Sequence, residues 1–253
     1  MGILNTDNNI KGDSMGFYEE LSKYYDIVFP LGQPQLKFIR ERLQGKEDIL
    51  DLAAGTGNYS IALAKEGYKV VAVDLDEEMV KKINVKNERE GTKVRPYALD
   101  MKEIHVLGSD IFDAVICIGN SLVHLESIEE IRDSLHKMYK LLRHRGMIVL
   151  QIVNYDRILK YDVKELPLID RKENGVKFIR NYGLEEGKIL FKTKLIVNND
   201  KTYDNCIKLY PLESKALVNL LKEIGFKDIR LYGGFDEKPY TIDSFPLVVE
   251  AYK

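Results

Sequence analysis

Apolar segments of strand length alternate with amphipathic segments of helix length through the middle of the chain. This alternation limits the fold more than any other feature of the sequence. It begins with DILDLAA at residues 48–54 and reaches GMIVLQIVN at residues 146–154. The apolar segments are nearly continuous, which is typical of parallel strands that are covered on both faces. The pattern therefore predicts an α/β fold, a doubly wound, Rossmann-like sheet with helices on both sides.

The pattern changes after Tyr155. Three strand-like segments follow one another between residues 176 and 210 without a helix, and NNDK at 198–201 is a turn signal between the last two. They predict a small antiparallel β insert that covers the substrate site. A helix and two closing strands follow. The expected domains are a flexible tail over 1–14, a Rossmann-like domain from 15–155 and 213–253, and the insert at 156–212.

Composition and charge favour a soluble globular protein over a nucleic-acid-binding or membrane protein. Hydrophobic residues make up 45% and charged residues 31% of the 253 residues, and the formal net charge is −2. This charge gives no broad attraction to nucleic acid, and no apolar run approaches the roughly 18 residues of a membrane span. Two cysteines and four histidines show no metal-ligand spacing. We expect a cytoplasmic protein without a metal, nucleic-acid or membrane partner. The oligomeric state is not indicated.

A glycine turn follows the first predicted strand in the segment DLAAGTGNYS at 51–60. Gly55 and Gly57 permit a tight turn and a close approach of the backbone to a ligand. The dinucleotide motif is incomplete, because Ser60 stands where its third glycine belongs, and the lysine of a Walker loop is also missing. Asp51, four residues before the first glycine, would repel a pyrophosphate and attract a cationic ligand.

Acidic residues also stand at the ends of the next two predicted strands. Asp74 in VAVDLD can accept hydrogen bonds from both hydroxyls of a ribose, and Asp100 in ALDM can accept one from an adenine amino group. Open α/β sheets bind ligands at such strand ends. S-adenosylmethionine combines adenine and ribose with an α-ammonium group and a sulfonium. The three acids therefore predict S-adenosylmethionine as the cofactor, with S-adenosylhomocysteine as its product.

Together these features resemble the class I S-adenosylmethionine-dependent methyltransferases, from about Phe17 to Lys253. AVICIGNSLVHL at 114–125, VNYDRIL at 153–159 and GGFDEKPY at 233–240 are similar to the glycine/sarcosine N-methyltransferase branch. Members of that branch carry G-N-S-x-x-H-L after the fourth strand and N-Y-D-x-I-L after the fifth. The resemblance implies a seven-stranded, mostly parallel sheet whose last strand is antiparallel. It also implies methylation of a small molecule, with an amine nitrogen as the expected acceptor and oxygen or sulfur as alternatives.

The resemblance also assigns roles to individual residues. Asn120 would face the acceptor, and His124 and Tyr25 complete the candidate catalytic set. The expected cofactor contacts are Tyr24, Tyr25, Asp51, Ala53, Gly55, Gly57, Asp74, Leu75, Asp100, Met101, Ile118 and His124. The expected substrate contacts are Asn120, Tyr155, Arg180 and Tyr240.

One position departs from the pattern of that branch. In the glycine enzymes the residue before N-Y-D is an arginine that binds the substrate carboxylate, and here it is Val153. A buried carboxylate without a partner would cost roughly 2–5 kcal/mol. Glycine is therefore a doubtful acceptor. Either Arg180 in FIRNYG supplies the cation from another direction, or the acceptor carries no carboxylate.

Two further functions stay open on the sequence alone. An RNA or protein methyltransferase would need a basic face or an added recognition domain, and the near-neutral charge argues against it. A non-catalytic, S-adenosylmethionine-binding regulatory protein would retain all three acids without turnover.

Overall fold

The computed structural model describes residues 7–253, which divide into two compact units. The α/β unit consists of Leu31–Asp162 and Tyr210–Lys253. The small-sheet unit consists of residues 7–30 and Val163–Leu209. No helix of residues 7–253 is long and apolar enough to cross a membrane.

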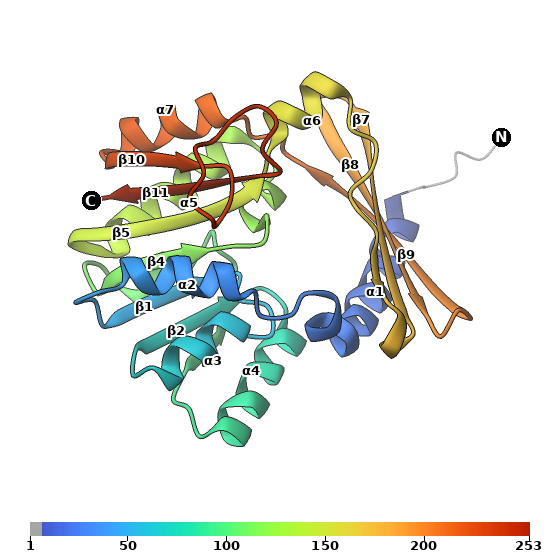
Figure 1. The fold of residues 1–253 in the computed structure, drawn as a ribbon, viewed down its shortest axis with the longest axis horizontal. Coiled ribbons are helices and arrows are strands. Elements are labelled where there is room, and N and C mark those ends of the chain that lie inside the picture. Colours follow the sequence, from blue (N-terminus) through green and yellow to red (C-terminus); the bar gives the residue numbers. More distant parts are fainter. Residues whose placement is uncertain (1–6) are drawn as a thin grey trace. The chain divides into compact units, whose positions relative to one another are not determined.

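The α/β unit holds a seven-stranded sheet with the strand order β10-β11-β5-β4-β1-β2-β3 (Figure 1). Its strands are β1 (Asp48–Leu52), β2 (Lys69–Asp74), β3 (Arg95–Ala98), β4 (Phe112–Cys117), β5 (Leu142–Val153), β10 (Lys227–Tyr232) and β11 (Pro246–Tyr252). Its helices are α2 (Gln33–Arg42), α3 (Asn58–Lys65), α4 (Glu77–Glu90), α5 (Ile128–Leu141), α6 (Tyr155–Tyr161) and α7 (Ser214–Ile224), with 3-10 turns at Ile104–Leu107 and Ser121–His124.

Strands β1 to β5 are parallel, and β11 inserts antiparallel between β5 and β10. Asp51 of β1 lies opposite Ala72 of β2 on one side and Ile116 of β4 on the other. The strand order therefore reverses between β1 and β4, which is the switch point where such sheets bind ligands. The predicted doubly wound sheet with an antiparallel last strand is confirmed.

Polar side chains cap the starts of two helices of the α/β unit. The Ser127 hydroxyl accepts a hydrogen bond from the backbone N–H of Glu130 and starts α5. The Asp76 carboxylate caps α4 in the same way. Helix α5 ends at Leu141, and β5 begins at the next residue.

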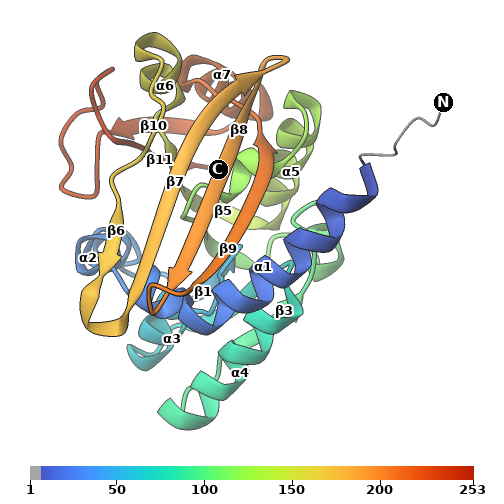
Figure 2. The ribbon, with the colours of Figure 1, turned by 90° about the vertical axis from the view of Figure 1, so that its right-hand side faces the viewer.

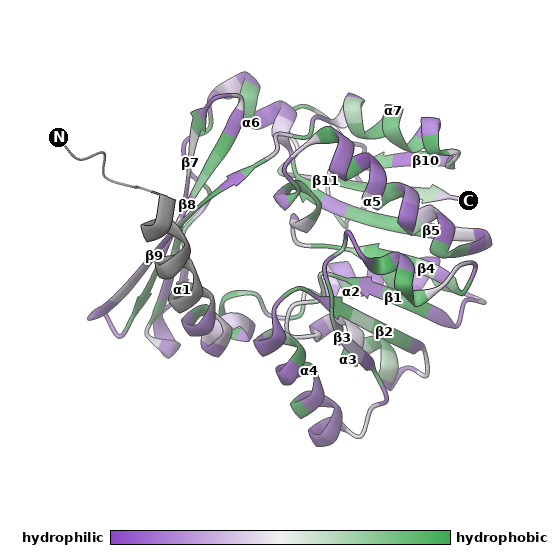
Figure 3. Ribbon diagram, turned by 180° about the vertical axis from the view of Figure 1, so that it is seen from behind, coloured by the Kyte–Doolittle hydropathy of each residue, from purple (hydrophilic) through white to green (hydrophobic). Residues whose placement is uncertain are grey.

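The core of the α/β unit lies between the sheet and its helices. Figure 3 shows hydrophobic residues along the central strands and hydrophilic residues along α4. Ile49, Ala72 and Ala114 of the sheet are completely buried, together with Ile39 of α2 and Ile83 of α4. This burial explains why the strands read as nearly continuous apolar runs.

The small-sheet unit is an antiparallel sheet with the strand order β6-β7-β8-β9, and helix α1 packs against it (Figure 2). Its elements are α1 (Asp7–Val28), β6 (Ile169–Arg171), a 3-10 turn at Lys172–Asn174, β7 (Val176–Glu185), β8 (Lys188–Val197) and β9 (Lys201–Leu209). Asn198 and Asn199 have φ angles of 54° and 55°, so NNDK forms the predicted tight turn.

One apolar core joins α1 to the small sheet. Phe17, Leu21 and Val28 of the helix pack with Phe178 and Leu195 of β7 and β8. This packing groups α1 with the small sheet, whereas the sequence prediction placed residues from 15 onward in the Rossmann-like domain. Of the predicted flexible tail, residues 1–6 lie outside the described residues, and residues 7–14 belong to α1. Residues 155–161 form helix α6 of the α/β unit, although the sequence prediction assigned residues from 156 onward to the insert.

Candidate functional site

The glycine turn after β1 is built from residues with left-handed backbone. Ala53, Gly55 and Gly57 have φ angles of 57°, 56° and 75°, and Gly57 caps the start of α3. A Cβ atom on Gly57 would lie 2.8 Å from Cγ1 of Ile83 in α4. Gly57 is therefore required both by the backbone conformation and by the closeness of α4.

Asp74 at the end of β2 is held in one orientation by two backbone donors. The N–H of Gly55 donates to its Oδ2 at 2.7 Å, and the N–H of Asp76 donates to its Oδ1 at 3.0 Å. Burial raises the pKa of this carboxyl, although these hydrogen bonds oppose the rise. Each oxygen retains a second lone pair that can accept a hydrogen bond from a ligand hydroxyl.

Asp51 lies beneath the turn and is only 3% exposed. The hydroxyl of Ser60 in α3 donates to its Oδ2. The pKa of Asp51 is raised to about 6, mainly by burial and further by the charge of Asp74, while the hydrogen bond from Ser60 opposes the rise. Ser60, noted in the sequence only because it breaks the dinucleotide motif, is thus the polar partner of this buried acid.

The predicted adenine side of the site continues from β2 to the end of β3. The backbone N–H of Leu99 donates to the carbonyl of Asp74 at 2.9 Å, which joins the two strand ends. The Asp100 carboxylate accepts from the N–H of Lys102 at 2.8 Å and stays partly exposed. Leu75 is 70% exposed, and Met101 is half-buried.

These groups fit the parts of S-adenosylmethionine that the sequence predicted for them. Asp74 has acceptor capacity for a ribose diol, Leu75 offers an apolar surface beside it, and Asp100 can accept a hydrogen bond from an amino group. Asp51 provides a negative potential for a cationic tail when it is ionised. The residues that the structure describes contain no group of three His, Cys, Asp or Glu side chains placed to hold a metal ion.

Lys86 of α4 supports the glycine turn and was not found from the sequence. Its side chain is buried, and Nζ donates to Oγ1 of Thr56 at 2.9 Å and to Oδ1 of Asn58 at 2.6 Å. No local signal marks it, because it lies in a helix rich in lysine and glutamate. Only the approach of α4 to the turn gives this lysine its role.

Asn120, a candidate catalytic residue, is fixed by its neighbours after β4. Its backbone is left-handed with a φ angle of 73°. Its Oδ1 accepts from the N–H of Val153 at 2.8 Å, and its Nδ2 donates to the hydroxyl of Tyr155 at 3.0 Å. Tyr155 is fully buried. Tyr155 is therefore a buried partner of the Asn120 side chain. Any effect of Tyr155 on the substrate would act through the Asn120 amide.

Ile118 and His124 flank Asn120 in the chain. Ile118 follows the end of β4 and is half-buried. His124 ends the 3-10 turn at Ser121–His124, and its side chain is exposed to solvent. The protein around it nevertheless lowers its pKa through desolvation. The imidazole is therefore neutral near pH 7.

Tyr240 is tied to the start of α6. Its hydroxyl oxygen lies 2.7 Å from Oδ1 of Asn154 and 2.7 Å from Oδ2 of Asp156. Burial and the neighbouring Asp156 raise the pKa of this phenol. Asn154 is fully buried, and its Nδ2 donates to the carbonyls of Ile242 and Ser244.

Tyr24, Tyr25 and Arg180 belong to the small-sheet unit. Tyr24 and Tyr25 lie in α1 and pack against the apolar core of that unit, and the Tyr25 ring centroid is 5.2 Å from that of Phe29. Arg180 lies in β7, and its Nη2 donates to the carbonyl of Pro167 at 2.8 Å. Their contacts with a cofactor or an acceptor remain predictions.

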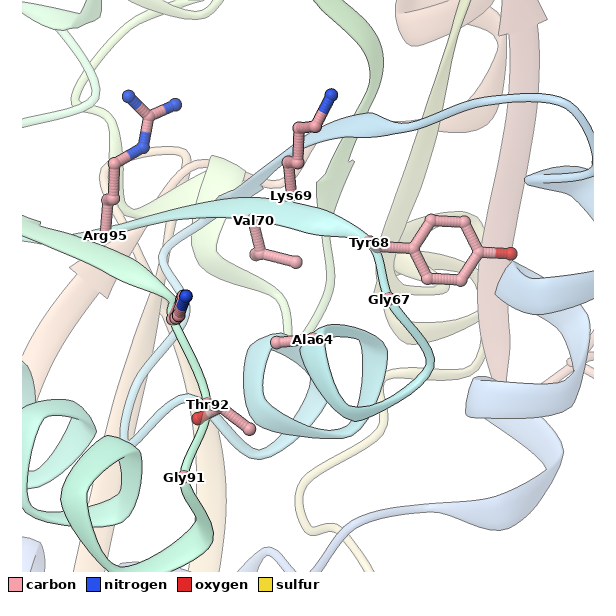
Figure 4. Close-up of a pocket in the computed structure, with 9 residues that line it drawn as sticks. Ala64, Gly67, Tyr68, Lys69, Val70, Gly91, Thr92 and Arg95 are labelled. Carbon is pink, nitrogen blue, oxygen red and sulfur yellow. The ribbon is translucent and has the colours of Figure 1, made fainter.

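The α/β unit also has a surface pocket (Figure 4). Its lining comes from the end of α3, the loop after α4 and the starts of β2 and β3, and includes Tyr68, Lys69 and Arg95. These are the amino ends of the strands, opposite to the carboxyl ends that carry Asp74 and Asp100. None of the predicted site residues lines it.

Comparisons with known proteins identify relatives of this chain. A family model described as a methyltransferase domain matches residues 49–146. A glycine/sarcosine N-methyltransferase from Aphanothece halophytica is 32% identical over 226 residues, covering 89% of this chain and 83% of the relative. A second protein of that name, from Halorhodospira halochloris, is 31% identical, covering 78% of this chain and 72% of the relative.

Solved structures share the fold at low sequence identity. An S-adenosylmethionine-dependent methyltransferase from Clostridium acetobutylicum superposes with a TM-score of 0.78 at 18% identity, covering 93% of this chain and 98% of the other. The shared architecture therefore extends over nearly the whole length of both chains.

Proposed function

The chain belongs to the class I S-adenosylmethionine-dependent methyltransferases, in the branch of the glycine/sarcosine N-methyltransferases, and we propose that it methylates an amine nitrogen of a small molecule. The main support is the relative from Aphanothece halophytica, because its 32% identity extends over 89% of this chain. The match therefore reaches well beyond the methyltransferase domain at 49–146. The net charge of −2 also suits a small acceptor better than a nucleic acid.

We assign the cofactor contacts to the carboxyl ends of β1, β2 and β3. Asp74 receives the ribose hydroxyls, since its two oxygens are already oriented by Gly55 and Asp76. Asp100 receives the adenine amino group. Ionised Asp51 attracts the cationic tail, and Lys86 keeps the turn in place through Thr56 and Asn58.

We assign the acceptor side to the segment after β4. When bound, S-adenosylmethionine supplies a methyl group on a sulfonium, which is a good leaving group. The chain therefore has to align the amine, exclude water and accept one proton. Asn120 is suited to alignment because Val153 and Tyr155 hold its amide in place. Neutral His124 can accept the proton, since its lowered pKa leaves the imidazole unprotonated near pH 7.

Calorimetry followed by an acceptor screen tests this function. The purified chain is titrated with S-adenosylmethionine and S-adenosylhomocysteine, and formation of S-adenosylhomocysteine is then measured with a panel of small primary and secondary amines. We expect binding of both ligands and turnover of at least one amine. Turnover only with RNA or protein would contradict a small-molecule acceptor. Tight binding without turnover of any acceptor class would indicate a regulatory protein.

A further inference from the structure

Strands β4 and β5 stay joined beyond the end of their parallel ladder. The ladder ends with Cys117 of β4 opposite Leu150 of β5. Three residues further along the chain from Cys117, the backbone N–H of Asn120 still donates to the carbonyl of Gln151 at 3.1 Å. The segment between is not a strand, because Gly119 and Asn120 have positive φ angles of 103° and 73°. A bend is therefore fastened to β5 at the carboxyl end of the sheet.

Two side-chain amides fasten this bend, one from each strand. Oε1 of Gln151 accepts from the backbone N–H of Gly119 at 2.9 Å. Oδ1 of Asn120 accepts from the backbone N–H of Val153 at 2.8 Å. Each amide thus takes the place of a backbone carbonyl that a regular parallel ladder would supply. We call these two hydrogen bonds the amide clamp.

Gln151 holds the bend with its backbone and with its side chain. Its carbonyl receives the N–H of Asn120, and its Oε1 receives the N–H of Gly119. All other residues from Met147 to Ile152 are apolar and buried, so a half-buried glutamine interrupts the run. Gly119 is exposed, and water can satisfy its N–H equally well. The side-chain bond is therefore better explained by the position it gives to the bend than by a need for a partner.

The amide clamp lies between the two sides of the proposed reaction. Ile118, an expected cofactor contact, precedes the bend, and Asn120, expected to face the acceptor, is part of it. The chain has to align the acceptor with the methyl group, and a displacement of about 1 Å can lower a rate about 100-fold.

We propose that Gln151 is a positioning residue for methyl transfer. Through its hydrogen bonds to Gly119 and Asn120 it fixes the amide that faces the acceptor, without touching the reacting atoms itself. All members of the clamp belong to the α/β unit. This assignment rests on the proposed function, because it names a residue that acts within that reaction.

Gln151→Met tests the assignment, since methionine has a similar length and only a weakly accepting sulfur. The measurements are S-adenosylhomocysteine binding by calorimetry and kcat with the amine that the acceptor screen identifies. We expect kcat to fall at least about tenfold and the Kd of S-adenosylhomocysteine to stay within about threefold, because alignment is lost while the acids at β1 to β3 are untouched. Gln44→Met is the matched control, because Gln44 is exposed in the turn after α2. The control should behave like the wild type.

Two further variants separate positioning from a structural role. Gln151→Glu keeps an acceptor oxygen for the N–H of Gly119 and should retain kcat within about threefold. In an Asn120→Ala background, Gln151→Met should lower kcat by less than about a further threefold, because a residue that acts through Asn120 has nothing left to position. Equal losses in the methionine and glutamate variants, or losses that simply add in the double variant, would overturn the assignment.

Amide hydrogen exchange tests the clamp without any acceptor. In the ligand-free protein, exchange at Gly119 should be at least about fivefold faster in Gln151→Met than in the wild type, and exchange at Leu150 inside the ladder should not change. Unchanged exchange at Gly119 would overturn the assignment. Wild-type kcat in Gln151→Met would overturn it while leaving the proposed function intact. If the wild-type protein methylates no amine, the proposed function fails and the assignment fails with it.

Discussion

The backbone N–H of Gly55 donates a 2.7 Å hydrogen bond to Oδ2 of Asp74, so the turn after β1 is anchored to the end of β2. The glycine turn and the predicted ribose acceptor therefore form one structural piece. Asp74 also accepts from the N–H of Asp76, which leads into the cap of α4. A change at this carboxylate should consequently affect both ligand binding and the shape of the turn.

Asp74→Ala should weaken binding of S-adenosylhomocysteine at least about 100-fold. A hydrogen bond to a charged group contributes about 1.5–3 kcal/mol, and two ribose hydroxyls would lose their acceptor. Isothermal titration calorimetry measures the change. Glu77→Ala is the control, since Glu77 is an exposed carboxylate in the first turn of α4. If both variants bind like the wild type, Asp74 does not hold the ribose.

Binding of S-adenosylmethionine should strengthen as the pH rises from about 5 to about 7. The pKa of Asp51 is raised to about 6 by burial, so the carboxyl is neutral at the lower pH and ionised at the higher one. The α-amino group of the ligand stays protonated over this range. Asp51→Asn should bind more weakly at pH 7 and should lose most of this pH dependence. An unchanged profile in the variant would exclude Asp51 as its source.

Asp51→Asn should also stabilise the ligand-free protein near neutral pH. Because the folded-state pKa is raised above the unfolded value, the contribution of Asp51 is fully present below the unfolded pKa and is lost as the pH rises to about 6. The gain at pH 7 is about 1–3 kcal/mol for a shift of this size. Urea denaturation at pH 4 and pH 7 should show the gain only at the higher pH.

Gly57→Ala should destabilise the protein more than Gly91→Ala. Both glycines have left-handed backbone, with φ angles of 75° and 65°, which costs about 1–2 kcal/mol for alanine. A Cβ on Gly57 also meets Ile83 at 2.8 Å, whereas one on Gly91 meets nothing within 4 Å. The additional loss at Gly57 is about 1–3 kcal/mol. If urea denaturation gives both variants the same loss in the free energy of unfolding, α4 moves away from the new Cβ on residue 57 without an energetic cost.

Asn154→Ala should lower the stability of the protein by about 2–4 kcal/mol, since it removes a helix cap and the buried donor that holds the 241–244 loop. Asn154 accepts from the N–H of Arg157 and donates to the carbonyls of Ile242 and Ser244. Asn84→Ala on the exposed side of α4 should change little. Denaturant unfolding distinguishes the two, and a loss at Asn154 no larger than that at Asn84 would contradict this role.

The sequence predicted the parallel centre of the sheet because those strands are buried on both faces, which leaves nearly continuous apolar runs. The count of seven strands came from the family resemblance. It did not predict that α1 packs on the small sheet, because Phe17 and Phe178 are far apart in the chain and nothing local connects them. Helix α6 was missed because its seven residues follow a strand directly and are too few for a helical period to show. The turn between β8 and β9 was found because Asn-Asn favours a positive φ.

The three sequence runs that resemble the glycine/sarcosine N-methyltransferase branch are joined by side-chain hydrogen bonds. Asn120 of the first run bonds to Tyr155 of the second, and Tyr240 of the third lies within hydrogen-bond distance of Asn154 and Asp156 of the second. In this chain the three runs therefore form one hydrogen-bonded scaffold beside the end of β5. The individual roles of these residues remain predictions.

The small-sheet unit is assembled from two chain segments, and this has a consequence for synthesis on the ribosome. Helix α1 ends at Val28, and the strand that completes its core begins at Val176. At about 5–20 residues per second, translation needs about 7–30 s to cover that interval. During this time Phe17, Leu21 and Val28 lack the strands that bury them in the finished protein. The nascent helix is thus an exposed apolar surface on which a chaperone could act before the sheet is made.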